Sequence, residues 1–137
     1  MTDKPDPVES ISAVTLLTTD MRAAVAFYRT LGFRLLYGGD DATFTSFGVG
    51  PGYLNLQFDL VPSLPRPVWG RVVFWVADVD ALYHRARNAG FDVQTEPADA
   101  PWGERYFHVR DPDGHELSIA RPLASSGPAR NSTPETR

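Results

Sequence analysis

The chain has 137 residues, a length that suits one domain with a substantial hydrophobic core. It contains no cysteine, which excludes disulfides, thiolate metal sites and cysteine nucleophiles and favours a cytoplasmic location. The net charge of −4 argues against a nucleic-acid partner and is compatible with a cationic ligand. No apolar run approaches the ~20 residues of a membrane-spanning helix, so we expect no membrane partner.

The first half of the chain follows a regular order of predicted elements. Residues 1–10 are polar, and we expect a disordered N-terminal tail there. A strand-like run over residues 13–20 ends in Asp20, a residue type that caps helices. Apolar positions then recur at helical spacing up to Leu31, and Gly32 suits the left-handed end of that helix. Three further strands are predicted at 33–37, 42–47 and 53–58.

The same order returns 58 positions later, after a Pro-rich stretch over residues 61–68 that predicts an extended connector. Residues 71–78 again form a strand-like run that ends in an aspartate, and Gly90 corresponds to Gly32. Further strands are predicted at 91–95, 105–109 and 116–120. The composition of residues 124–137, rich in Ser, Thr, Pro and Ala, predicts a disordered C-terminal tail.

The sequence therefore predicts an α+β fold made of two tandem βαβββ modules. We expect one domain over residues 11–123, with the first module at about 11–60 and the second at about 69–123. The segment from Asp20 to Phe33, with its aromatic pair and terminal Leu-Gly-Phe, and the turn Asp111-Pro-Asp-Gly-His115 carry a family resemblance. The duplicated modules with these motifs resemble the vicinal-oxygen-chelate superfamily of glyoxalases, bleomycin-resistance proteins and ring-cleaving dioxygenases. The resemblance implies an open cup of strands and a homodimer, with modules paired within or between subunits.

In metal-dependent members of this superfamily, His, Gln or Glu side chains hold a divalent ion. The resemblance carries their positions over to Ala13, Arg71 and Ser118, with Asn55 as the matching fourth position. Alanine offers no donor atom, and arginine brings a permanent positive charge into the position. We therefore expect neither a metal ion nor another cofactor.

The three histidines have different expected surroundings. His84 lies in the second predicted helix, where we expect exposure to solvent, and His115 lies in a turn with a structural role. Strand alternation turns His108 away from the core and toward the cup. A metal site rebuilt on His108 and Glu116 would need a third donor.

Strand alternation also predicts which side chains line the cup. A pocket walled by aromatic rings with a few polar groups is typical of a small-molecule site. The predicted ligand-binding residues are Thr15, Tyr53, Asn55, Gln57, Arg71, Trp75, Trp102, Tyr106, His108, Glu116 and Ser118.

Three of these residues have two interpretations each. Trp75 either stacks on a flat ligand or packs in the core or at a dimer interface. Arg71 either binds a carboxylate or phosphate, or pairs with Glu116 across the former metal position. Trp102 lies in a long connection, where it is either a lid over the site or an aromatic ring packed under its own loop.

We expect a metal-free small-molecule-binding protein of the bleomycin-resistance type, which sequesters an antibiotic or another aromatic or cationic metabolite. The alternative is a metal-independent isomerase, lyase or cyclase in which His108 and Glu116 act as acid and base. The residues at the metal positions argue against a metal-dependent glyoxalase or dioxygenase. A regulatory or scaffold domain without a ligand is a further hypothesis.

Overall fold

The computed structural model describes residue 7 and residues 9–59 and 71–124. The predicted connector over 61–68 and most of the two predicted tails lie outside these residues. The elements are, in chain order, β1 (Ala13–Thr18), α1 (Met21–Thr30), β2 (Arg34–Tyr37), β3 (Phe44–Val49), β4 (Gly52–Phe58), β5 (Arg71–Trp75), α2 (Val79–Asn88), β6 (Asp92–Val93), β7 (Ala98–Asp99), β8 (Glu104–Arg110) and β9 (Glu116–Pro122).

Both helices begin and end where the sequence predicts. The side chains of Asp20 and Asp78 each accept a hydrogen bond from the backbone N–H three residues later, at 3.1 and 3.0 Å. These bonds satisfy donors that the first turn of a helix otherwise leaves unpaired. Gly32 and Gly90 follow the helices with φ angles of +101° and +79°, a left-handed conformation that glycine adopts without strain. Each helix has ten residues, and nothing in the described part of the chain forms a helix capable of spanning a membrane.

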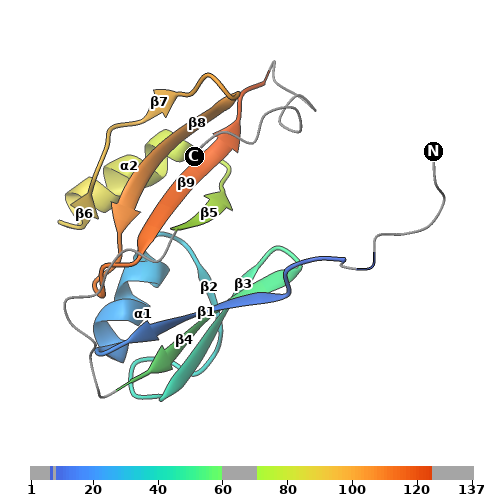
Figure 1. The fold of residues 1–137 in the computed structure, drawn as a ribbon. Helices are drawn as coiled ribbons and strands as arrows, with labels where there is room; N and C mark the ends of the chain where they lie inside the picture. Colours follow the sequence, from blue (N-terminus) through green and yellow to red (C-terminus); the bar gives the residue numbers. More distant parts are fainter. Residues whose placement is uncertain (1–6, 8, 60–70, 125–137) are drawn as a thin grey trace.

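Each module builds its own sheet, as Figure 1 shows in the lower and upper halves of the molecule. The first sheet has the strand order β1-β4-β3-β2, and the second has the order β5-β9-β8-β6, with β7 also paired to β8. In each sheet the first and last strands of the module run parallel and side by side, while the other pairs are antiparallel. The predicted α+β fold of two βαβββ modules is confirmed.

The segment after α2 departs from the predicted single strand over 91–95. It contains the two-residue strand β6, and a second short strand, β7, forms in the connection that was expected to be a loop. Both pair with β8, β6 near Arg110 and β7 near Tyr106. Pro97 lies between them and has no backbone N–H to donate, which explains why one continuous strand does not form.

One hydrophobic core extends through both modules. The aromatic pair of α1 lies at its centre, and the rings of Phe27 and Phe91 from the two modules are 4.6 Å apart. The rings of Phe33 and Phe74, also from different modules, are 4.9 Å apart in an edge-to-face arrangement. The strands contribute alternate buried residues to this core, namely Leu16, Phe47, Leu54, Leu56, Phe74, Phe107, Val109, Leu117 and Ile119. The core-facing side of these strands is therefore as strand alternation predicts, while on the other side of β9 Ser118 and Ala120 are buried as well.

The turn between β8 and β9 fastens the second module to the first. Asp111 is buried and its Oδ2 accepts a hydrogen bond of 2.7 Å from the Tyr28 hydroxyl of α1. Its Oδ1 accepts from the backbone N–H groups of Asp113 and His115, at 3.0 and 2.9 Å. Burial raises the pKa of the Asp111 carboxyl, and burial followed by the Asp111 charge raises the pKa of Tyr28. The buried His115 ring donates through Nε2 to the carbonyl oxygen of Leu17 at 2.7 Å, so this histidine has a structural role.

Candidate ligand-binding face

The face of the second sheet that points away from the core gathers most of the predicted site residues; we call it the open face. Because β5, β9 and β8 are paired in register, side chains on this face lie in rows across the strands. The rows are Arg71, Glu116 and Arg110, then Val73, Ser118 and His108, then Trp75, Ala120 and Tyr106.

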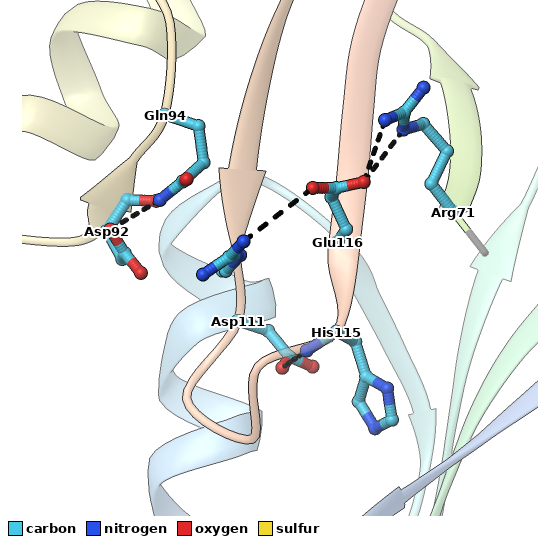
Figure 2. Close-up of polar contacts among 7 residues, drawn as sticks. Arg71, Asp92, Gln94, Asp111, His115 and Glu116 are labelled. Atoms are coloured by element: carbon cyan, nitrogen blue, oxygen red, sulfur yellow. Dashed lines mark hydrogen bonds and ion pairs between the residues drawn. The ribbon is translucent and has the colours of Figure 1, made fainter. Parts of the chain in front are cut away.

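The first row contains an ion pair between neighbouring strands. Arg71 donates from Nε and Nη2 to the same Glu116 oxygen, Oε1, at 3.1 and 2.8 Å (Figure 2). The other oxygen, Oε2, lies 4.0 Å from Arg110 Nη2. Of the two interpretations of Arg71, the structure contains the bridge to Glu116.

The residues at the four carried-over metal positions do not fit a divalent ion. Ala13 has no donor atom, and Arg71 places its guanidinium at the position of a ligand. Ser118 is only 1 % exposed, and Asn55 donates to the hydroxyl of Thr15 at 3.3 Å. Within residues 9–59 and 71–124, no group of three or more His, Asp or Glu side chains is placed to hold a metal ion. A site rebuilt on His108 and Glu116 therefore has no third donor in this part of the chain.

Aromatic rings occupy the other end of the open face. The indole N–H groups of Trp75 and Trp102 donate to the two oxygens of Glu104, at 2.9 and 3.2 Å. Glu104 itself is 1 % exposed, whereas Trp75 is 50 % exposed. The Trp102 ring centroid lies 5.7 Å from that of Tyr106, which lies 5.1 Å from His108. We call the four rings of Trp75, Trp102, Tyr106 and His108 the aromatic wall.

Glu104 was missed as a site residue by sequence reasoning. The predicted strand began one residue later, at Arg105, so the alternation was not extended to Glu104. The alternation, extended back by one position to residue 104, places Glu104 on the same face as Tyr106. This pattern was the signal that could have identified Glu104. Trp102 packs beside Tyr106 and bonds to Glu104, which matches the interpretation of a ring packed against its own loop.

His108 and Glu116 do not form an assembled acid–base pair. The His108 ring makes no hydrogen bond to the described residues, and its Nε2 is buried without a partner. Burial, and then the charge of Arg71, lower the pKa of His108, while Glu116 raises it less. The neutral imidazole is therefore favoured near neutral pH. Glu116 is instead hydrogen-bonded to Arg71 through Oε1 and makes no hydrogen bond to His108 among the described residues.

The predicted site residues of the first sheet lie apart from the aromatic wall. Thr15, Tyr53, Asn55 and Gln57 share the face of that sheet opposite the core. No hydrogen bond, ion pair or ring contact among the described residues joins these four to the open face of the second sheet. The two modules do meet around a cavity of about 250 Å³, at their neighbouring edge strands. Its lining residues include Ala13, Tyr53, Val72, Val73 and Phe74.

The family model of the glyoxalase/bleomycin resistance protein/dioxygenase superfamily matches residues 10–119. The chain belongs to this superfamily, and the resemblance seen in its sequence is confirmed.

Among individual proteins, the chain is 50 % identical over 86 residues to an uncharacterized protein of Mycobacterium tuberculosis, covering 63 % of this chain and 40 % of that protein. It is 34 % identical to the anthracycline biosynthesis protein DnrV of Streptomyces peucetius, covering 86 % of this chain and 45 % of that protein. The chain thus spans less than half the length of these two relatives. The crystal structure of TioX from Micromonospora sp. ML1 is similar, with 32 % identity, a TM-score of 0.66, and 83 % and 99 % of the two chains covered.

Proposed function

We propose that this protein binds a planar aromatic small molecule on the open face of the second sheet, without a metal ion. The observation that carries the proposal is the arrangement of Trp75, whose ring is half exposed while its N–H is bound to the buried Glu104. A large ring held in one orientation at the surface loses little conformational freedom when a flat ligand covers it. Stacking on such a ring contributes about 0.5–1.5 kcal/mol beyond the area that it buries.

The relatives support a natural product or a similar metabolite as the ligand. The superfamily name includes bleomycin resistance proteins, and one relative is named as an anthracycline biosynthesis protein. Anthracyclines contain fused planar rings of the kind that an aromatic wall accommodates. Binding and sequestration, rather than turnover, agree with a face on which His108 and Glu116 are not joined by a hydrogen bond.

We further propose that the protein works as a homodimer. On the first sheet, the face that points away from the core exposes Leu17 and Tyr53, at 37 % and 49 %. Strand β2 of the same sheet exposes Leu36 and Tyr37, at 46 % and 66 %. Exposed apolar side chains of this size favour an interaction surface on this sheet, and a symmetric dimer covers the same residues on both copies. Size-exclusion chromatography with light scattering tests this: a strictly monomeric mass at micromolar concentration would contradict it.

Native mass spectrometry of protein expressed in metal-rich medium is the first test of the binding function. We expect a species without a divalent ion, and one ion per subunit would contradict a metal-free site. Calorimetric titration with an anthracycline and with a bleomycin follows.

For any compound that binds, Trp75→Ala is expected to weaken the affinity about tenfold, because about 1.4 kcal/mol of stacking and burial is lost. His84→Ala removes an exposed ring from α2 and serves as the matched control. Equal affinities of wild type and Trp75→Ala would exclude the stacking role.

A further inference from the structure

Arg110 lies at the end of β8 farthest from the tryptophans and has unused hydrogen-bonding capacity. Its side chain is 39 % exposed, and its guanidinium makes no hydrogen bond to the described residues. Among residues 9–59 and 71–124, the buried Nε has no hydrogen-bond partner, and the one ion-pair contact is the 4.0 Å approach of Nη2 to Glu116. A guanidinium carries five N–H donors, and a buried donor without an acceptor costs about 1–3 kcal/mol. The exposed part of the guanidinium, rather than the buried Nε, is what an external acceptor can reach.

The two carboxylates that flank Arg110 are engaged elsewhere. Glu116 accepts both of its short hydrogen bonds from Arg71 through Oε1. Asp92 is the register partner of Arg110 on β6, yet its Oδ1 accepts a 2.6 Å hydrogen bond from Gln94 (Figure 2). No ion pair within 4.0 Å joins Asp92 to Arg110 among the described residues. Neither Glu116 nor Asp92 therefore hydrogen-bonds to the Arg110 guanidinium, which is available to an external acceptor.

His108 adds a second unsatisfied group on the same face. It lies two residues before Arg110, so strand alternation points both side chains to the open face. Its ring is half buried and forms no hydrogen bond with the described residues. Along β8 the face thus presents the Tyr106 ring, the His108 imidazole and the Arg110 guanidinium over about 13 Å, since two residues of a strand rise about 6.6 Å. That length matches a flat molecule of about three fused rings with a polar group at one end.

We propose that Arg110, with His108 beside it, binds a carboxylate or another anionic oxygen of the ligand whose planar part stacks on the aromatic wall. The inference rests on the proposed binding function and deepens it, because it names the ligand class as a planar aromatic acid. A carboxylate can accept two parallel N–H donors from one guanidinium, which fixes its orientation as well as its position. The ligand then lies along β8, with its acidic end at Arg110 and its rings toward Trp75 and Trp102.

Three probes with one ring system and different charge test this inference: naphthoate, naphthylmethanol and naphthylmethylammonium, each titrated by calorimetry at the same pH and ionic strength. We expect naphthoate to bind about tenfold or more tightly than the neutral alcohol, and the ammonium compound to bind most weakly. Arg110→Gln is expected to abolish the preference for naphthoate and leave the affinity for the alcohol nearly unchanged. Arg110→Lys keeps the charge but loses the planar fork, so an intermediate preference is expected. Arg29→Gln removes the same charge from the exposed end of α1 and should retain the full preference.

Equal binding of the three probes by the wild type, tightest binding of the ammonium compound, or a preference that survives in Arg110→Gln overturns the inference. These outcomes leave the stacking function intact if Trp75→Ala still weakens all three probes. Failure of all three probes to bind overturns the inference and counts against the stacking function as well. Near-ultraviolet circular dichroism and the unfolding midpoint verify that each variant is folded.

Discussion

The two modules are alike on the sheet faces that point into the core, the covered faces, and different on the faces that point away from it, the open faces. Each begins with a strand, caps its helix with an aspartate, ends the helix at a left-handed glycine and sends alternate residues into the shared core. On the faces that point away from the core, the first module has the hydrogen-bonded pair Thr15 and Asn55 together with the exposed Leu17 and Tyr53. The second module has the ion pair of Arg71 and Glu116 and the aromatic wall.

The difference separates what the fold requires from what it leaves free. A covered position must supply an apolar side chain of suitable volume, because a cavity or an unpaired polar group in the core costs several kcal/mol. An open position tolerates most substitutions within about 0.5 kcal/mol. The repeated features are therefore those of folding, and the unrepeated ones are those in which ligand recognition has the most freedom to develop.

The largest expected effect concerns the turn that joins the modules. Asp111→Ala removes the acceptor of the Tyr28 hydroxyl and of two backbone N–H groups in a buried setting. We expect a loss of about 3 kcal/mol in the free energy of unfolding, because these donors lose their partners without gaining water. Urea unfolding measures it. Asp41→Ala, whose carboxylate is 89 % exposed, is the control and should cost at most about 0.5 kcal/mol. A small effect at Asp111 would mean that this carboxylate contributes little to the contact between the modules.

The next effect concerns the second module only. Glu104→Gln keeps one acceptor oxygen but replaces the other with an amide nitrogen, which cannot accept from an indole N–H. We expect about 1–2 kcal/mol of destabilisation and an upfield shift of the indole N–H resonance of Trp75 or Trp102 in a nitrogen–proton correlation spectrum. Glu96→Gln, on an exposed residue, should change neither quantity. Unshifted indole resonances in Glu104→Gln would show that Glu104 does not orient the tryptophans.

A smaller effect tests the equivalence of the two helix starts. Asp20→Ala and Asp78→Ala each remove one capping hydrogen bond and should each cost about 1 kcal/mol. Since the two caps belong to different helices and their hydrogen bonds share no residue, the double variant should lose about the sum, about 2 kcal/mol. Thermal or urea unfolding of the three variants provides the measurement. A clearly larger loss in the free energy of unfolding for one of the two variants would show that the two helix caps are not equivalent.

The smallest effect is a pH dependence that arises from His108. Its pKa is lowered from 6.5, mainly by burial and then by Arg71, against the opposing charge of Glu116. Below pH 6.5 the unfolded chain therefore binds more protons at this residue than the native protein does, and stability falls as the pH decreases. His108→Gln should flatten this part of the stability profile between pH 7.5 and 5.5, whereas His84→Gln, in the exposed part of α2, should not. Identical profiles for wild type and His108→Gln would mean that the ring is not desolvated in solution.

Much of the fold was predictable because its signals are local. The caps at Asp20 and Asp78, the glycines after the helices and the alternation of strands each depend on residues within a few positions. The short strands β6 and β7 were predicted less well, since their extent depends on pairing with β8 and on the interruption at Pro97. The bridge between Arg71 and Glu116 was one of two open interpretations until the register of β5 and β9 was known.

By itself, the amino-acid sequence determined the two βαβββ modules and their core-facing strand faces, because these follow from residue type and short-range spacing. Its resemblance to the superfamily implied that Ala13 and Arg71 occupy metal-ligand positions, where neither residue suits a divalent ion. Only the tertiary structure decided the partners of the polar side chains: Tyr28 with Asp111 across the module boundary, Glu104 with two indoles, and Arg110 without a hydrogen bond to the described residues. Such partnerships join residues far apart in the sequence, 83 positions for Tyr28 and Asp111, and their geometry depends on strand register and helix packing, which no local pattern specifies.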